Sequence, residues 1–155
     1  MNPPIRGEED RLALLEGIAD GTIDMIATDH APHSAEEKAG GLRGSLMGIV
    51  GLETAFPLLY TNLVLPGIIT LDRLTELMCT APAKRFGIPA GFENDCYTVF
   101  RTDTEYTIDP QEFLSMGRNT PFTGWKVRGA CALTVCRGKI VYDDGSLPRR
   151  REINQ

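Results

Sequence analysis

The sequence has 155 residues, of which 42% are hydrophobic and 24% charged, and a formal net charge of -5. These values are typical of one soluble globular domain and exclude a disordered chain. They also argue against nucleic acid as a partner, because phosphate binding needs a basic face and the basic run at Arg149 to Arg151 is typical of a solvated tail. We find no signal peptide and no apolar run long enough to span a bilayer, so we expect a cytoplasmic protein with no membrane partner.

The first elements in chain order are a helix and a short strand. Apolar residues recur at helical spacing from Leu12 to Ala19, after an acidic first turn. Gly21 can end this helix in the left-handed conformation. Residues 23–28 form a short apolar run after that turn and predict a buried strand.

Two further helices are predicted after a glycine-rich loop. One covers 52–64, where Pro57 limits how regular the first turns can be. The other begins at Thr70, whose side chain can cap it, and stops at Gly87. The first 90 residues therefore form the α/β part of the predicted fold.

The composition changes after Pro89 and becomes rich in β-forming residues. Arg137 and Gly138 separate two of the predicted strands and predict a tight hairpin turn. We therefore assign residues 91–155 to a small β-rich subdomain. Its predicted strands lie at 96–100, 106–108, 131–136 and 139–142.

The four cysteines lie at 79, 96, 131 and 136, and none forms a CxxC pair. This spacing fits a reducing compartment. Cys131 and Cys136 lie in one predicted strand, with side chains expected on opposite faces. Buried free thiols are therefore favoured over zinc ligands.

Asp29 and both histidines of the chain lie within five residues, directly after the predicted strand. In a parallel α/β barrel, functional side chains project from the carboxyl ends of the strands. A carboxylate at that place can bind a metal, or take a proton from a metal-bound water and pass it to a leaving nitrogen. The same sequence is equally typical of an aspartate that caps the following loop.

Four further features offer weaker signals. His33 can contact a substrate carboxylate, or be a solvated loop histidine, and His30 is less favoured because Pro32 stiffens the loop. Asn2, beside two prolines, can donate its amide to a substrate or simply form a turn. The glycines in the loop 34–45 suit a flap over the site and equally an exposed loop.

Four segments in a fixed order resemble the signatures of bacterial-type (class I) dihydroorotases, which are cyclic amidohydrolases. Four ordered motifs are far more specific than one short match, and the β-rich end also resembles the C-terminal part of that family. The resemblance covers essentially the whole chain. The segments are NPPIR at 2–6, DHAPH at 29–33, MGIVGLE at 47–53 and GRNTPFTGW at 117–125.

This resemblance implies a zinc-dependent enzyme that reversibly cyclises N-carbamoyl-L-aspartate to L-dihydroorotate in pyrimidine biosynthesis. It implies that Asp29 is a metal ligand and the general acid/base that serves a zinc-bound hydroxide. It implies that Asn2 and His33 hold the substrate, with Met47 and Gly48 contributing from the next loop. Met47 departs from the pattern, since the family usually has a phenylalanine there; methionine keeps an apolar wall without the flat ring.

A complete barrel needs about 250 residues. The fold class expected is therefore α/β: the last βα units of an incomplete amidohydrolase-type (β/α)8 barrel, followed by the β-rich subdomain. Catalytic zinc normally has three protein ligands, so Asp29 is insufficient and little activity is expected from the chain alone. Exposed edges predict a homo-oligomer or pairing with a missing N-terminal portion.

Three alternatives stay open. The chain can derive from another cyclic amidohydrolase, such as an allantoinase or a dihydropyrimidinase, although the second and fourth motifs disfavour the latter. It can be a non-catalytic scaffold that binds an enzyme of the pathway, although the joint presence of Asn2, Asp29 and His33 argues against this. It can also be a small α/β protein without a ligand, which four ordered motifs disfavour.

Overall fold

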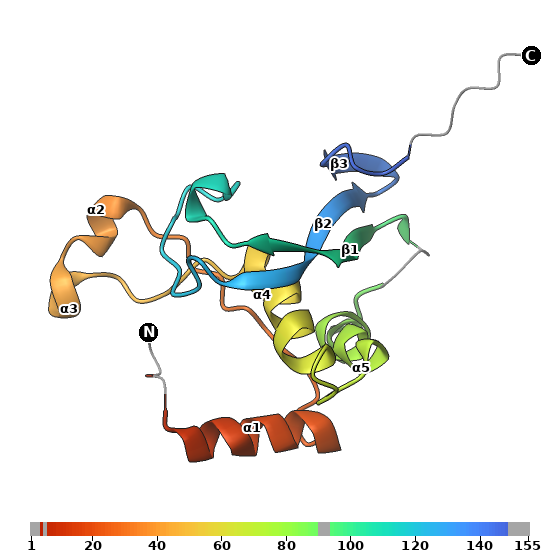
Figure 1. Ribbon diagram of the computed structural model, residues 1–155, viewed down its shortest axis with the longest axis horizontal. Helices are drawn as coiled ribbons and strands as arrows, with labels where there is room; N and C mark the ends of the chain where they lie inside the picture. Colours follow the sequence, from red (N-terminus) through yellow and green to blue (C-terminus); the bar gives the residue numbers. More distant parts are fainter. Residues whose placement is uncertain (1–3, 5, 90–93, 149–155) are drawn as a thin grey trace, which may run out of the picture.

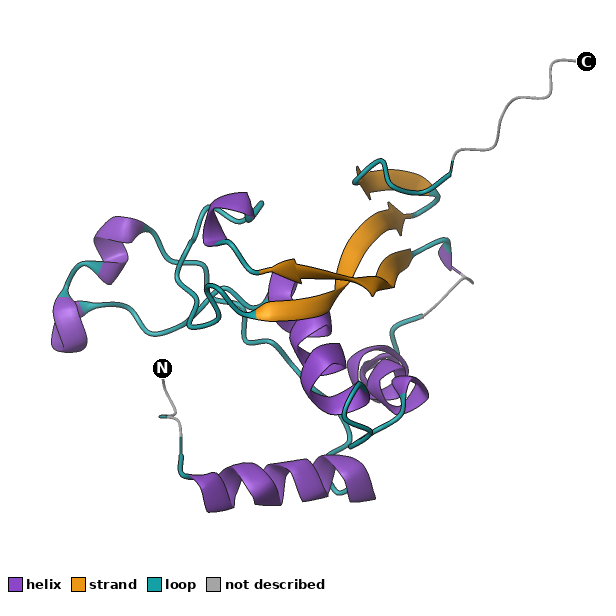
Figure 2. Cartoon of the chain, in the orientation of Figure 1, coloured by secondary structure: helices purple, strands orange, loops and turns teal. Residues whose placement is uncertain are grey.

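The computed structural model describes residues 4, 6–89 and 94–148 (Figure 1). Helices occupy the first part of the described chain and strands the second, as the composition predicts (Figure 2). The main elements are α1 (Glu8–Asp20), α2 (Ala35–Lys38), α3 (Gly41–Gly44), α4 (Leu52–Leu59), α5 (Leu71–Thr75), α6 (Ala81–Phe86), β1 (Tyr97–Thr107), β2 (Lys126–Cys136) and β3 (Lys139–Asp143). Short π-helical segments continue α4 and α5, namely η1 (Tyr60–Val64) and η2 (Glu76–Thr80), and η4 (Pro110–Glu112) is a 3-10 turn.

Helix α1 begins and ends as predicted. Its first turn is acidic, and the Asp10 carboxylate accepts a hydrogen bond from the Gly7 amide at 3.2 Å. Gly21 follows the last turn with a φ of 90°, the left-handed conformation that a glycine adopts without strain. The helix lies apart from most of the molecule in Figure 1, and Leu12 and Leu14 are more than half exposed.

The two later helices pack into a leucine-rich helical cluster. Thr70 caps α5 as predicted, because its hydroxyl accepts a hydrogen bond from the Arg73 amide at 3.1 Å. Gly87 ends α6 with a φ of 63°. The buried members of the helical cluster are Leu63, Ile69, Leu74 and Leu77, and Leu15, Ile18 and Ile26 pack against them.

The predicted buried strand at 23–28 is wrong. No regular strand occurs there in the described chain, and Ala27 is exposed. The Ile26 amide donates to the Leu77 carbonyl at 3.0 Å. Just after this segment, His30 and Ile49 form an isolated parallel β-bridge. A strand needs a continuous neighbour to bond with, and this segment has only isolated partners among the described residues.

The second part of the described chain forms an antiparallel sheet in the order β1-β2-β3. This confirms the prediction that it is rich in strands. The two strands predicted at 96–100 and 106–108 are one strand, β1, whose register shifts at Val99/Phe100 and Arg101/Glu105. These irregularities interrupt the sequence pattern without ending the strand. The predicted hairpin turn is confirmed, since Arg137 and Gly138 have φ values of 50° and 72°.

The sheet packs against α4. The rings of Phe56 and Phe100 stack with their centroids 3.9 Å apart. Gly129 allows this close approach, because a Cβ at that position would lie 2.9 Å from Phe56 Cε1. A second core of Val50, Ile108, Phe113 and Val127 joins residues from both sides of position 90, and the domain boundary at 90/91 stays a prediction.

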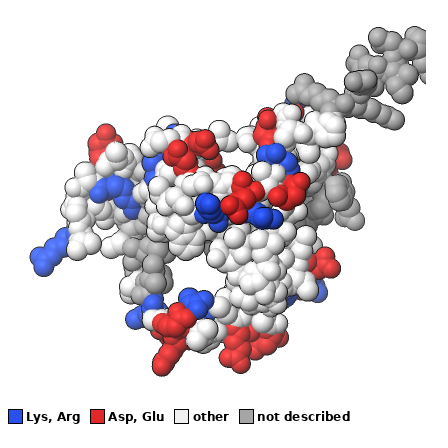
Figure 3. Space-filling model, in the orientation of Figure 1, with Lys and Arg blue, Asp and Glu red and all other residues white. Residues whose placement is uncertain are grey.

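The surface carries mixed charges, and the cysteines differ in how exposed they are. Acidic and basic side chains lie among one another on the face shown in Figure 3. No helix in the described ranges is long and apolar enough to cross a membrane. All four cysteines are free, as expected, but the prediction that Cys131 and Cys136 are buried is wrong: Cys131 is half-buried and Cys136, at the end of β2, is exposed.

Candidate functional site

Three of the four family motifs meet in one place. A Cβ at Gly117 would lie 2.7 Å from Pro32 Cα, so the fourth motif lies directly against the second. The Ala31 amide donates to Ile49 O and the Val50 amide to Asn119 O, both at 2.9 Å. Residues 29–33, 47–53 and 117–125 are therefore side by side, although the sequence separates them by up to 96 positions.

Asp29 comes immediately before the parallel bridge at His30. It is exposed and has a φ of 46°, a left-handed conformation that aspartate tolerates better than most residues. Its carboxylate accepts no hydrogen bond from the following loop in the described chain, so the loop-capping alternative gains no support. The carboxylate is open to solvent and to any group that approaches this side of the loop.

His30 binds the backbone at the start of α4. Its Nδ1 accepts hydrogen bonds from the amides of Gly51 and Leu52, at 3.1 and 3.2 Å. These are orphan donors at a helix N-terminus, which the imidazole satisfies as a capping residue would. Nδ1 can accept these two hydrogen bonds only if it carries no proton. His30 therefore has a structural role in this loop.

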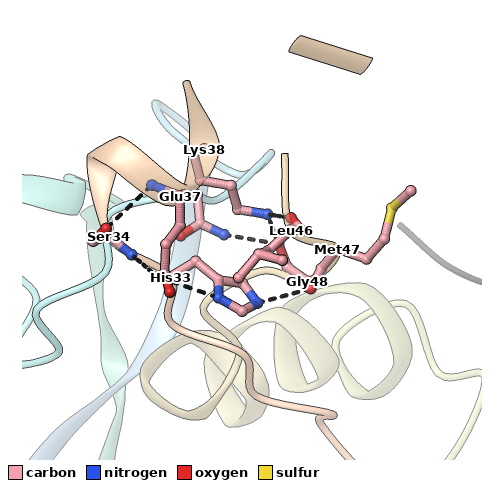
Figure 4. A network of polar contacts seen from close by, with 8 residues as sticks. His33, Ser34, Glu37, Lys38, Leu46, Met47 and Gly48 are labelled. Carbon is pink, nitrogen blue, oxygen red and sulfur yellow. Dashed lines mark hydrogen bonds and ion pairs between the residues drawn. The ribbon is translucent and has the colours of Figure 1, made fainter. Parts of the chain in front are cut away.

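His33 is held by both ring nitrogens (Figure 4). Nε2 lies 2.9 Å from the Met47 carbonyl oxygen, which can only accept, so Nε2 carries a proton and donates. Nδ1 lies 3.5 Å from Glu37 Oε2. The ring therefore has one defined orientation, and it connects the second motif to the third.

Met47 and Gly48 present backbone, not side chain, to this contact. The Met47 side chain turns away from His33 in Figure 4 and is 54% exposed. Gly48 has a φ of 129°, and a Cβ there would lie 2.3 Å from Ala31 Cβ, so only glycine fits. The Gly48 amide has no acceptor among the described residues.

Two side chains hold the Gly48 carbonyl from different directions. Lys38 Nζ donates to it at 2.6 Å and also to Leu46 O at 2.6 Å, while Asn119 Nδ2 donates to it at 2.8 Å. With the Met47 carbonyl bound by His33, both peptide groups that flank Gly48 have fixed orientations. The free Gly48 N–H is consequently a positioned hydrogen-bond donor.

The loop 34–45 contains two short helices in place of a plain glycine-rich segment. Ser34 caps α2: its hydroxyl accepts from the Glu37 amide at 3.2 Å, and Glu37 Oε2 accepts from the Ser34 amide at 2.8 Å. The Ser34 amide and, less strongly, the charge of His33 hold the pKa of Glu37 below its ordinary value. Leu42 in α3 is 99% exposed. The role of this loop as a flap stays a prediction.

Sequence reasoning missed three residues that build the site. Glu53 accepts hydrogen bonds from the Leu114 and Ser115 amides at 2.8 and 3.0 Å, which holds the segment that leads into the fourth motif. Glu53 and Asn119 lie inside quoted motifs, so the motifs themselves were a signal. Lys38 lies in none, and its partners are backbone carbonyls that no sequence pattern reveals.

The predicted site residues are thus partly brought together. His33, Met47 and Gly48 are in direct contact, and Asp29 belongs to the same loop as His33. Asn2 lies outside the described residues. No group of three or more His, Cys, Asp or Glu side chains that could hold a metal ion occurs among the described residues.

No family model matches the chain. Curated dihydroorotases from Bacillus thuringiensis (strain Al Hakam) and Bacillus cereus (strain AH187) are each 54% identical to it over 150 residues, which are 94% of this chain and 35% of theirs. These relatives confirm the resemblance that the ordered motifs indicate. The chain spans about a third of the length of the relatives that it matches.

Solved structures of related enzymes have the same fold over the same span. An L-hydantoinase (dihydropyrimidinase) from Arthrobacter aurescens is 32% identical, with a TM-score of 0.81 over 96% of this chain and 35% of its own. A D-hydantoinase (dihydropyrimidinase) from Thermus sp. is 27% identical, with a TM-score of 0.84 over 97% and 35%. The chain is therefore a homologue of part of the dihydroorotases and has the corresponding part of the amidohydrolase fold.

Proposed function

We propose that this chain supplies part of a dihydroorotase site, which reversibly cyclises N-carbamoyl-L-aspartate to L-dihydroorotate in pyrimidine biosynthesis. The observation that carries the proposal is 54% identity to dihydroorotases over 94% of the chain. The meeting of three motifs around Gly48 supports it. In this proposal residues 1–90 are the last βα units of a (β/α)8 barrel and residues 91–155 its C-terminal subdomain.

Asp29 is the proposed general acid/base. Its carboxylate is exposed at the start of the loop, where it can take a proton from an attacking water and return it to the leaving ring nitrogen. In the reverse direction the same group accepts the proton of the attacking amide nitrogen.

The zinc that the family implies does not fit the described residues alone. Zinc would lower the pKa of a bound water and make it a nucleophile at neutral pH. Three protein ligands are usual for a catalytic zinc, and no group of three such side chains occurs among the described residues. The role of Asp29 as a metal ligand is therefore proposed only for an assembly in which other donors come from outside the described chain.

The substrate carboxylate is the proposed ligand of the Gly48 amide and His33. The Gly48 N–H has no acceptor among the described residues, and its orientation is fixed because His33, Lys38 and Asn119 bind the flanking carbonyls. The part of His33 in substrate binding is proposed from the family resemblance, since in this structure its Nε2–H donates to the Met47 carbonyl. Asn2 is proposed to add an amide donor, and Met47 an apolar wall.

The test is complementation. The chain is mixed with zinc and a polypeptide that corresponds to the rest of the Bacillus cereus dihydroorotase, and dihydroorotate hydrolysis is followed. We expect activity only in the mixture. Asp29→Asn should abolish it, because asparagine keeps the left-handed backbone and loses the proton acceptor. The matched control is Asp24→Asn, an exposed acid five residues earlier, which should retain activity.

A complex that forms without turnover would contradict the proposal and favour the scaffold reading. A second chemistry also has an observation behind it, since the solved relatives are named hydantoinases or dihydropyrimidinases. A substrate panel with hydantoin, dihydrouracil, allantoin and dihydroorotate would decide between them. Faster opening of any ring other than dihydroorotate would replace the first proposal.

We also propose that the chain associates with a partner in the cytoplasm, either a second copy or a polypeptide equivalent to the rest of its relatives. Exposed apolar side chains support this, and Figure 3 shows open space between α1 and the remainder of the molecule. Light scattering of the dilute chain tests it, and a monomer would contradict self-association. The largest exposed apolar side chains include Leu42, Leu114, Met116 and Phe86.

A further inference from the structure

Two cysteines lie opposite each other at the end of the β1/β2 ladder. The register pairs Thr98 with Thr134 and Tyr97 with Val135, so the next step places Cys96 opposite Cys136. The two segments remain hydrogen-bonded beyond the paired residues, because the Gly138 amide donates to Asp95 O at 3.0 Å. Directly opposite residues of an antiparallel pair point to the same face, with Cβ atoms about 4.5–5.5 Å apart.

The Cys96 thiol is held over the end of β2. The Arg137 amide donates a hydrogen bond to Cys96 Sγ at 3.2 Å, and Arg137 is the residue that follows Cys136. Cys96 is half-buried, whereas Cys136 is exposed to solvent. A disulfide needs Cβ atoms about 3.5–4.5 Å apart. Closing the pair therefore requires the two Cβ atoms to approach by at most about 1 Å, next to the hairpin turn.

We propose that Cys96 and Cys136 form a peroxide-oxidised thiol pair, a modification site independent of the proposed enzyme function. A hydroperoxide takes two electrons from the exposed Cys136 thiolate, which becomes a sulfenic acid as the O–O bond breaks. The Cys96 thiolate then attacks the Cys136 sulfur, the S–S bond forms, and the sulfenic oxygen leaves as water. The sum is two thiols and one H2O2 to one disulfide and two waters.

The other two cysteines lack this arrangement. Cys79 is exposed in η2, on the helical side of the molecule, and Cys131 is half-buried in β2, where its sulfur lies 3.5 Å from Thr134 Oγ1. Neither has a cysteine opposite it. They are controls within the same chain: Cys79 for exposure without a neighbouring thiol, and Cys131 for the same strand with less exposure.

The experiment treats the folded chain with hydrogen peroxide, alkylates the remaining thiols, digests without reduction and maps the peptides by mass spectrometry. We expect one dominant linked peptide that joins Cys96 to Cys136, two hydrogens lighter than its free thiols and reversed by dithiothreitol. Cys79 and Cys131 should remain largely alkylatable. The same treatment in urea should lose the preference for this pair.

Single variants test the order of the two steps. In Cys96→Ser, the sulfenic acid of Cys136 should persist and react with dimedone, whereas Cys136→Ser should show several-fold less dimedone label at Cys96. Cys96 and Cys136 both alkylated after oxidation would overturn the proposal. Linkage of Cys136 to Cys79, to Cys131 or to another chain as often as to Cys96 would overturn it equally, and none of these mapping results depends on a variant that folds.

Discussion

The helical cluster and the loops around Gly48 are held together by different forces. In the helical cluster, leucine and isoleucine side chains bury apolar surface, which is favourable but not directional. Around Gly48, side chains bind backbone atoms at about 3 Å, and each bond fixes both a distance and a direction. The second kind of contact is what a binding site needs, since it fixes donors before a ligand arrives. Its side chains are His30, His33, Lys38, Glu53 and Asn119.

The largest expected effect comes from the helical cluster. Leu77→Ala removes a side chain that is fully buried and leaves a cavity among close-packed neighbours. We expect a loss of about 2–5 kcal/mol in the free energy of unfolding. Urea unfolding, followed by circular dichroism, measures it. Leu71→Ala, in the same helical run but 43% exposed, should cost about 1 kcal/mol or less. Equal losses would show that the cluster is not the apolar core of this part.

Gly48→Ala should act on the loops more than on the helices. The added Cβ would meet Ala31 Cβ at 2.3 Å, and the residue would keep a φ of 129°, so the loops must separate. We expect a loss of about 2–3 kcal/mol. Hydrogen exchange of the Ala31 and Val50 amides, which bond across these loops, should become faster, while exchange in the helical cluster changes little.

Two other glycines separate the causes of that effect. Gly67 has a φ of 77° with open space around it, so Gly67→Ala measures the backbone cost alone. Gly117 has an ordinary backbone conformation, but an added Cβ would collide with Pro32, so Gly117→Ala measures the steric cost alone. Gly48→Ala should exceed each of them. A loss no greater than that of Gly67→Ala would mean that the contact with Ala31 relaxes freely.

Glu53→Gln tests the directional contacts without changing the size of the side chain. The carboxylate accepts from two amides, and the glutamine side chain offers only one neutral oxygen, so one donor loses its acceptor and the other loses a charged one. We expect a loss of about 1–2 kcal/mol, with faster exchange at Leu114 and Ser115. Glu112→Gln, an exposed acid nearby, should have no measurable effect. A similar effect from both would assign the loss to net charge.

Local signals explain most of the fold that the sequence predicted. Thr70 caps its helix through a bond to an amide three positions away, and Gly21 and the turn at Arg137 act through their own backbone conformation; the structure confirms all three. The strand at 23–28 depended on neighbours that its own residues do not specify. The continuity of β1 was missed because a register shift breaks the alternation of side chains without breaking the ladder.

The site shows the same division. Motif order located His33, Met47 and Gly48, and the structure places them together. His30 and Lys38 were not identified as structural residues, because their partners are backbone atoms 21 and 10 positions away, and a backbone atom has no residue identity to recognise. Sequence patterns therefore identify candidate site residues more readily than the side chains that orient the backbone around them.

Acid should affect the loops before the helical cluster, although the effect is the smallest of those expected. The Ser34 amide, and then His33, hold the pKa of Glu37 below its ordinary 4.5, so this cap is fully formed above that pH and is lost as the pH falls through the lowered pKa. The buried leucines have no titrating group. NMR amide shifts of Ser34 and Glu37 should therefore move below pH 4.5 while those of Leu74 and Leu77 stay constant, and Glu37→Gln should remove the transition at Ser34. A common midpoint for all four amides would show instead that the two parts unfold together.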